Sequence, residues 1–212
     1  MRLRGFHVDS VVRLHGEHND LSKEESIRFW EAKLADGYYD AFHQGIECTT
    51  FSRSAMVKGC GPAYRDNVHI LGLPLSRIGT KRKAKADLGN TLARASLRFW
   101  LAAKRSRKRV RGSWENPGSS LLWRFPGVKQ ATQADTWNYM CYCRYGRPFK
   151  KRTCIITAGF SLGPLSTLMC NHKQRHSVVL QGNHAGQCRT KLGNKYPKRL
   201  IRSWIDDTVD GL

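Results

Sequence analysis

The chain has 212 residues, with 37 Lys and Arg against 16 Asp and Glu, which gives a formal net charge of +21 and a pI of about 10.2. A chain of this length folds by default as one domain with a sizeable core, and no apolar run approaches the length of about 18 residues that would indicate a membrane span. The N-terminus lacks the apolar core of a secretion signal, so we expect an intracellular protein whose seven scattered cysteines remain free thiols.

The N-terminal segment predicts a strand, a helix and a second strand. Residues 8–14 are apolar and β-branched, which is typical of a short strand. Ser22, followed by two glutamates, can open a helix because its oxygen accepts from unpaired N–H groups and the acids suit the positive helix end. Apolar side chains recur at helical spacing as far as Gly37, and residues 38–42 predict the next strand. Such a unit implies parallel strands and a right-handed crossover.

The rest of the chain predicts fewer elements. Residues 53–80 are rich in Gly and Pro and predict a long loop. Residues 88–103 predict a helix, and the run into Trp114 predicts a short strand. Residues 152–158 predict another strand, and residues near 197–205 predict a final helix. We therefore expect an α/β fold with an incomplete, Rossmann-like and mainly parallel sheet, flanking helices and long loops.

Cys48 and Glu115 are the sharpest candidates for a catalytic pair. Both stand at predicted strand ends, and neighbouring parallel strands share the crevice where open α/β sheets bind ligands. A thiol can add to an electron-poor ring carbon, while a desolvated carboxyl can hold the proton that the ring nitrogen needs, as in cytosine C5 methylation. The alternatives are a small apolar residue at Cys48 and a loop carboxylate at Glu115 that pairs with nearby cations.

Three motifs in order resemble the C5 cytosine-specific DNA methyltransferases. Residues 48–52 read Cys-Thr-Thr-Phe-Ser, residues 115–117 read Glu-Asn-Pro, and residues 145–153 read Tyr-Gly-Arg-Pro-Phe-Lys-Lys-Arg-Thr. The family has a Pro-Pro-Cys-Gln turn with the nucleophile, a Glu-Asn-Val strand end and a Gly-Val-Pro-Gln-x-Arg-x-Arg segment. The Glu-Asn-Pro form is similar to divergent methylase-like proteins of mobile elements and protists. The resemblance implies a nucleophile at Cys48, a proton donor at Glu115 and, at Lys151, a cation in place of the family's first arginine.

The resemblance also implies a site for S-adenosylmethionine, of which only part is present. Asp20 matches the carboxylate that reads the adenine, and Asp9 could match the acid on the ribose. The family's Phe-x-Gly-x-Gly loop does not occur in the 19 residues before Asp20, so the chain resembles a methyltransferase domain that begins after its first strand and loop. The other departures are Ile46 and Glu47 for the double proline, Phe149 for the glutamine and Thr153 for the second arginine.

Two dense basic clusters, together with the net charge, predict a nucleic-acid partner, and DNA is the expected one. A positive field attracts phosphate backbones and favours sequence-independent binding through counterion release. The clusters could also act as a nuclear import signal or form a solvated face, although almost no acids balance them. Their members are Lys81, Arg82, Lys83 and Lys85, then Lys104, Arg105, Arg107, Lys108, Arg109 and Arg111.

The C-terminal half is rich in thiols and imidazoles. Cys170, His172 and His176 could supply zinc ligands, with Cys141 or Cys143 completing a tetrahedron. The sequence has neither a Cys-x2-Cys pair nor the spacing of a zinc finger, so buried thiols and exposed histidines are the leading expectation, and no metal is assigned.

Three functional interpretations stay open. The chain is an active methyltransferase, a degenerate methylase-like module that only binds nucleic acid, or a zinc-stabilised nucleic-acid binder. The missing glycine loop favours the second interpretation for the chain in isolation. In that interpretation residues 1–160 form the methyltransferase-like domain and residues 161–212 form an irregular C-terminal extension of it.

Overall fold

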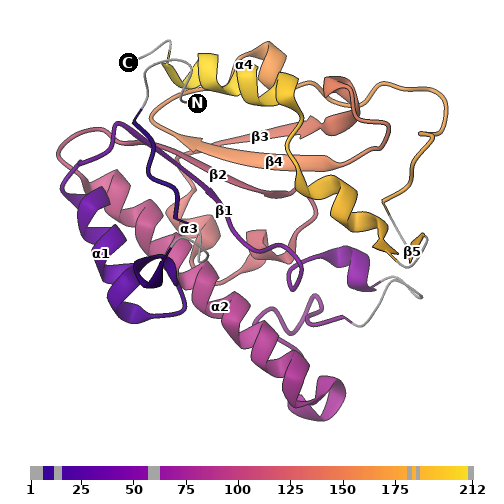
Figure 1. The fold of residues 1–212 in the computed structure, drawn as a ribbon, viewed down its shortest axis with the longest axis horizontal. Coiled ribbons are helices and arrows are strands. Elements are labelled where there is room, and N and C mark those ends of the chain that lie inside the picture. Colours follow the sequence, from indigo (N-terminus) through magenta and orange to yellow (C-terminus); the bar gives the residue numbers. More distant parts are fainter. Residues whose placement is uncertain (1–6, 12–15, 57–62, 181–182, 185–186, 210–212) are drawn as a thin grey trace.

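A computed structural model describes residues 7–11, 16–56, 63–180, 183–184 and 187–209 (Figure 1). Its centre is a four-stranded open sheet in which β1 and β2 are parallel, while β4 is antiparallel to both β2 and β3. A separate two-stranded ribbon is formed by β5 and β6. In sheet order the strands are β1 (Ala41–Gly45), β2 (Arg111–Pro117), β4 (Arg152–Ala158) and β3 (Thr136–Cys141), and the ribbon contains β5 (Asn183–His184) and β6 (Gln187–Cys188).

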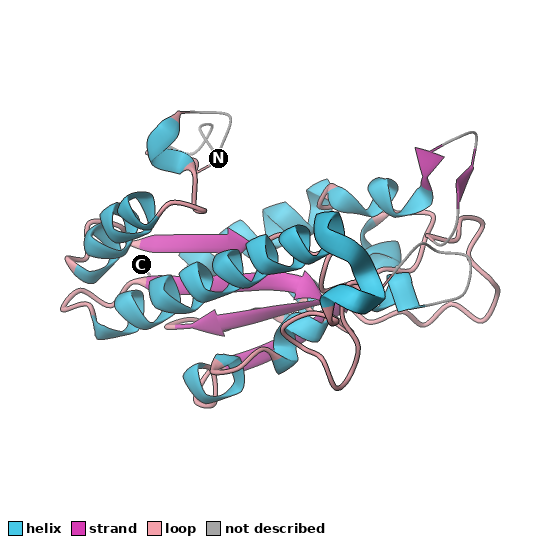
Figure 2. Cartoon of the chain, turned by 90° about the horizontal axis from the view of Figure 1, so that it is seen from below, coloured by secondary structure: helices cyan, strands magenta, loops and turns pink. Residues whose placement is uncertain are grey.

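Helices lie on both sides of the sheet. The helices α1 and α2 cover one face and α4 covers the other (Figure 1). Figure 2, seen from the side of α2, shows this helix lying along the strands in front of the sheet. The helices are α1 (Glu24–Ala35), α2 (Leu75–Arg105), the short α3 (Val128–Ala131) and α4 (Lys198–Val209). No helix in the described ranges is both long enough and apolar enough to cross a bilayer.

Strand β4 shows how the sheet divides the core. Successive side chains of a strand point to opposite faces, so Ile156 packs with Trp114 and with Trp100 of α2, whereas Ile155 packs with Trp204 of α4. The C-terminal residues therefore share a core with the sheet. Glu115 follows Trp114 directly in β2, so its side chain points toward the α4 layer.

The expectation of a mainly parallel sheet is wrong, because one of the three strand pairings is parallel. The parallel unit is β1–α2–β2 rather than the predicted unit of residues 8–14, 22–37 and 38–42. Residues 8–11 form no strand, and residues 12–15 lie outside the described part of the chain. The antiparallel half arises because the chain reverses at a 3-10 turn, η6 (Tyr142–Tyr145), which directs β4 back along β3.

The helix α2 begins at Leu75, inside the segment that the sequence predicts as a long loop. Gly79, with φ 71° and ψ 165°, interrupts the helix near its start. The predicted helix at residues 88–103 is the C-terminal half of α2. This half packs on both sides, with Trp100 against the sheet and Phe99 against α1, which explains why it shows the clearest apolar pattern.

Candidate functional site

The parallel pairing of β1 with β2 brings the first two motifs together. Gly45, the last residue of β1, lies opposite Glu115 in the ladder. The side-chain amide of Asn116 donates to the carbonyl of Ile46 at 3.3 Å and links the two strand ends. Cys48 follows in the next turn, close enough for the charge of Glu115 to act on its thiol. The cysteine and the carboxylate therefore lie close together at the carboxyl ends of β1 and β2, the position where the sequence predicts the crevice.

Lys151, the residue just before β4, joins this pair. Its Nζ lies 3.7 Å from Glu115 Oε1 and donates to the carbonyl oxygen of Gly193 at 3.0 Å. The ammonium group also lies 4.6 Å from the centre of the Tyr142 ring, within the range of a cation–π contact. The three residues that the resemblance implies as catalytic thus meet at the carboxyl ends of the two parallel strands.

The carboxyl group of Glu115 is buried, with 6% of the residue exposed. Burial raises the pKa of Glu115, while the Lys151 charge and the Tyr196 hydroxyl act in the opposite direction. Tyr196 donates its hydroxyl to Oε2 at 3.0 Å, whereas Oε1 is buried with no hydrogen-bond partner. Oε1 has the Lys151 ammonium group at 3.7 Å but makes no hydrogen bond, so it can still accept one from a ligand.

Cys48 is a partly buried free thiol. Burial raises its pKa; Lys151 opposes this shift, and Glu115 and Glu47 add to it. The side chain of Glu47 accepts from the backbone N–H of Thr50 at 2.9 Å and from its hydroxyl at 3.0 Å, so it closes the turn that holds Cys48. The resting group is therefore a thiol rather than an activated thiolate.

Arg65 fixes this turn from the side of α2, a role that sequence reasoning missed. Its guanidinium is buried and donates to the Thr50 carbonyl at 3.2 Å and to the Ala86 carbonyl at 2.7 Å. It also reaches Asn90 Oδ1 at 2.6 Å and lies 3.9 Å from the centre of the Phe51 ring. Burial lowers the pKa of Arg65 to about 10, which leaves it charged at neutral pH.

The C-terminal segment also contacts this group of residues, which the sequence did not indicate. Tyr196 and Gly193 contact Glu115 and Lys151, although both follow a stretch of the chain without clear periodicity. Tyr196 also stands 3.2 Å from the imidazole of His43 in β1. No sequence signal marks Tyr196, because its role depends on contacts over about eighty residues of chain.

The two predicted cofactor residues lie elsewhere. Asp9 accepts from the Tyr39 hydroxyl at 2.6 Å, and Lys33 Nζ lies 3.9 Å from it, which places Asp9 at the amino end of β1. Asp20 accepts from the backbone N–H of Ser22 at 3.0 Å and so shapes the turn before α1. Neither carboxylate is described in contact with Cys48 or Glu115.

The two basic clusters lie at opposite ends of α2. Arg65 ties Ala86 to the turn of Cys48, so residues 81–85 lie at the end of the sheet that carries the crevice. Lys108 pairs with Asp40 just before β1, so residues 104–111 lie at the other end. Several cluster members already have partners: Lys83 with Asp87, Lys104 with Asp135, and Arg111 with the Thr208 carbonyl.

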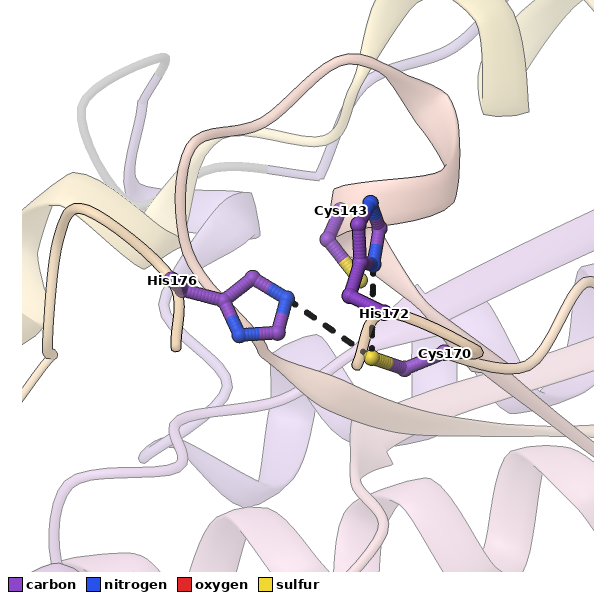
Figure 3. A group of neighbouring side chains, drawn as sticks. All are labelled: Cys143, Cys170, His172 and His176. Carbon is purple, nitrogen blue, oxygen red and sulfur yellow. Dashed lines mark hydrogen bonds between the residues drawn. The ribbon is translucent and has the colours of Figure 1, made fainter. Parts of the chain in front are cut away.

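The structure identifies which cysteine joins Cys170, His172 and His176 as a possible fourth zinc ligand. Cys143, rather than Cys141, comes together with Cys170, His172 and His176, and the ligand atoms of these four all lie within 4.8 Å of one another (Figure 3). Cys141 is buried in the last position of β3.

No protein-family model, curated protein or solved structure matches this chain.

Proposed function

We propose that this chain is a methyltransferase-like, nucleic-acid-binding domain whose crevice receives a cytosine base beside Cys48, Glu115 and Lys151. The observation that carries the proposal is that these three residues, which come from three separate motifs, meet at the carboxyl ends of two parallel strands. Ligands of open α/β sheets bind at this position. The Rossmann-like interpretation then applies to the β1–α2–β2 unit.

The chemistry available to this group is addition of a thiol to a pyrimidine ring. The Cys48 thiol first loses its proton to solvent, and the thiolate sulfur then forms a bond to C6 as the C5–C6 double bond shifts to C4–C5 and the C4–N3 electron pair moves to N3. N3 takes a proton from Glu115, which is left as a carboxylate, and reversal of these steps restores the base and the thiol. A buried carboxyl with a raised pKa retains that proton closer to neutral pH. Lys151 is the cation that can stabilise the Cys48 thiolate before the addition.

The two carboxylates that the resemblance assigns to S-adenosylmethionine have other contacts. Asp9 is engaged with Tyr39 and Lys33 at the far end of β1, and the Asp20 carboxylate is used in the turn of Ser22. The proposed chemistry of this chain is therefore base binding and reversible thiol addition, without methyl transfer. This favours the degenerate methylase-like module over the active enzyme for this chain alone.

A nucleic-acid partner is supported by the net charge of +21 and by the cluster at residues 81–85 near the crevice. Among described residues, Lys81, Arg82 and Lys85 have exposed side chains and no acidic partner. The helix resumes after Gly79, so its positive N-terminal end lies close to these cations. The positive charges of the cations and of the helix end repel each other, and an anion between them relieves this repulsion. A phosphate backbone would supply such anions.

The test uses a single-stranded oligonucleotide with one pyrimidin-2-one, a cytosine analogue without the 4-amino group. This ring is more electrophilic at C6, so a thiol adds to it without any cofactor. We expect one adduct per chain by intact-mass spectrometry, located on Cys48 by peptide mapping and lost in Cys48→Ser. An adduct on Cys170 instead, or none at saturating oligonucleotide, contradicts the proposed base site. Salt-dependent binding of the same oligonucleotide tests the nucleic-acid partner separately.

A further inference from the structure

Four potential metal ligands converge beside the turn that joins β3 to β4. Cys143 comes from η6, while Cys170, His172 and His176 come from one loop between β4 and β5 (Figure 3). Cys170 Sγ lies 3.5 Å from His172 Nδ1 and 3.6 Å from His176 Nε2. Because a thiol carries one proton, it can donate to only one of these two rings at a time.

These separations fit a tetrahedral ion. Zinc bonds of about 2.3 Å to sulfur and about 2.0–2.1 Å to nitrogen require a sulfur–nitrogen edge of about 3.6 Å. The two measured sulfur–nitrogen distances are 3.5 and 3.6 Å. The ligand atoms of the whole group lie within 4.8 Å of one another, so small side-chain rotations close the remaining edges.

The donor set selects the class of metal. Two thiols and two imidazoles suit Zn²⁺, whereas Mg²⁺ and Ca²⁺ take oxygen ligands, and none of the four residues provides one. Two thiolates neutralise a divalent cation, so the complex adds no charge beside Arg147 and Arg175. These two arginines line the same solvent-accessible depression as Cys143 and His176, which gives an ion a path to the site.

Other contacts hold the two ends of the loop but not its middle. The backbone N–H of Cys141 donates to the Leu168 carbonyl at 2.9 Å on one side, and Val178 donates to the Pro148 carbonyl at 3.2 Å on the other. Between them, residues 171–175 are all exposed. Packing therefore does not explain why three ligands of this loop converge on Cys143.

We infer that Cys143, Cys170, His172 and His176 form a structural Zn²⁺ site that fastens the loop at residues 170–176 to the β3–β4 turn. Protein ligands then occupy all four coordination positions of the ion, which is the pattern of structural rather than catalytic zinc. Cys143 follows Tyr142, whose ring lies beside Lys151, so the site also stiffens one wall of the crevice.

Metal content tests this inference without any assay of function. We expect the full chain, expressed with zinc and purified under reducing conditions, to keep one equivalent of Zn²⁺ through dialysis. Co²⁺ substitution should give thiolate charge-transfer absorption and the strong d–d bands of a tetrahedral site. The Cys170→Ser and His176→Ala variants should lose the equivalent, whereas Cys141→Ala and His69→Ala should retain it, because neither residue belongs to the group.

A second measurement, on the wild-type chain, tests the inference even if the variants fail to fold. A strong chelator should lower the midpoint of thermal unfolding, and Zn²⁺ but not Mg²⁺ should restore it. A chain that binds no stoichiometric zinc, or one whose zinc survives Cys143→Ser with Cys170→Ser, overturns the inference. A Cys143–Cys170 disulfide in the reduced preparation also overturns it, because the thiolates would then be unable to bind the ion.

Discussion

Gly45 lies opposite Glu115 in the parallel ladder and leaves the space that the carboxylate and its partner occupy. A Cβ at position 45 would stand 2.7 Å from the Tyr196 hydroxyl oxygen and 3.7 Å from Glu115 Oε2. The same hydroxyl donates to Oε2 at 3.0 Å. A residue without a side chain in β1, a carboxylate in β2 and a tyrosine from the C-terminal segment therefore form one unit.

We expect Gly45→Ala to destabilise the fold by about 1–3 kcal/mol, because the new methyl group would overlap the Tyr196 hydroxyl. Tyr196→Phe removes that oxygen, so the double variant should lose less stability than the two single losses added together. Urea unfolding of the four proteins measures this coupling. Strict additivity would show that the two positions do not meet in solution.

Glu115 should make stability depend on pH in a predictable direction. Burial raises its folded-state pKa above the ordinary 4.5, so its contribution to stability is complete below that value and is lost as the pH rises through the raised pKa. Glu115→Gln keeps the shape without the charge. We expect this variant to gain stability relative to wild type as the pH rises above 4.5, the ordinary pKa of the group, toward neutral pH. Glu25→Gln, on the exposed side of α1, is the control, and an equal gain there would contradict the assignment.

Local signals in the sequence predict local structure. The apolar run at residues 152–158 is β4, with the bounds expected, and the predicted helix near residues 197–205 overlaps α4, which begins one residue later and continues to Val209. The periodicity of a strand indicates which of its faces are buried but not the direction of its neighbour, which is why the sheet was predicted as mainly parallel. The strand β3 was missed because only the face with Trp137, Tyr139 and Cys141 is uniformly apolar or aromatic, whereas the other face begins with the polar Thr136 and Asn138.

The residues of the proposed site also divide into those with a local sequence signal and those without one. Cys48, Glu115 and Lys151 are candidates from the sequence because each belongs to a short motif that carries its own chemistry, and the structure brings the three residues together. Arg65 and Tyr196 were missed because their roles arise from contacts between distant segments. Arg65 stands in a Gly- and Pro-rich stretch where a buried guanidinium has no local signature, since its acceptors belong to the Cys48 turn and to α2.

Substitution of the buried Arg65 should destabilise the fold far more than substitution of an exposed arginine. Arg65→Ala leaves buried acceptors at Thr50, Asn90 and Ala86 without their donor, and we expect a loss above about 3 kcal/mol. Arg65→Lys should recover part of this loss, because an ammonium group reaches fewer of the acceptors. Arg77→Ala, which removes an arginine with 58% of its side chain exposed, should change stability by less than about 0.5 kcal/mol. Chemical denaturation compares the three, and equal losses would contradict the buried role.

The position of the basic clusters predicts an asymmetry in nucleic-acid binding. A variant with Lys81, Arg82 and Lys85 changed to alanine loses three charges near the crevice. Its matched control changes Arg105, Arg107 and Arg109, which removes three charges from the far end of α2. For a short cytosine-containing single strand, we expect the first variant to bind more weakly.

The salt dependence of binding gives the measurement. Each phosphate of a single strand that a variant no longer neutralises should reduce the slope of log K against log salt by about 0.7, so the slope of the first variant should fall by up to about 2. The far-end variant should retain most of the wild-type slope with a short strand. Equal reductions in the two variants would point to net charge alone rather than to a binding site at the crevice.

The reactivity of Cys48 should depend on the charges around it. Lys151 lowers the pKa of this thiol and Glu115 raises it, while burial dominates. The thiolate is the reactive form, so Lys151→Met should slow alkylation of Cys48 by iodoacetamide near neutral pH, and Glu115→Gln should accelerate it. Rates measured across a pH series separate a shifted pKa from altered access, because access changes the plateau and the pKa moves the midpoint. Opposite signs in the two variants support the arrangement, whereas a slower rate in both would mean that the substitutions merely block the crevice.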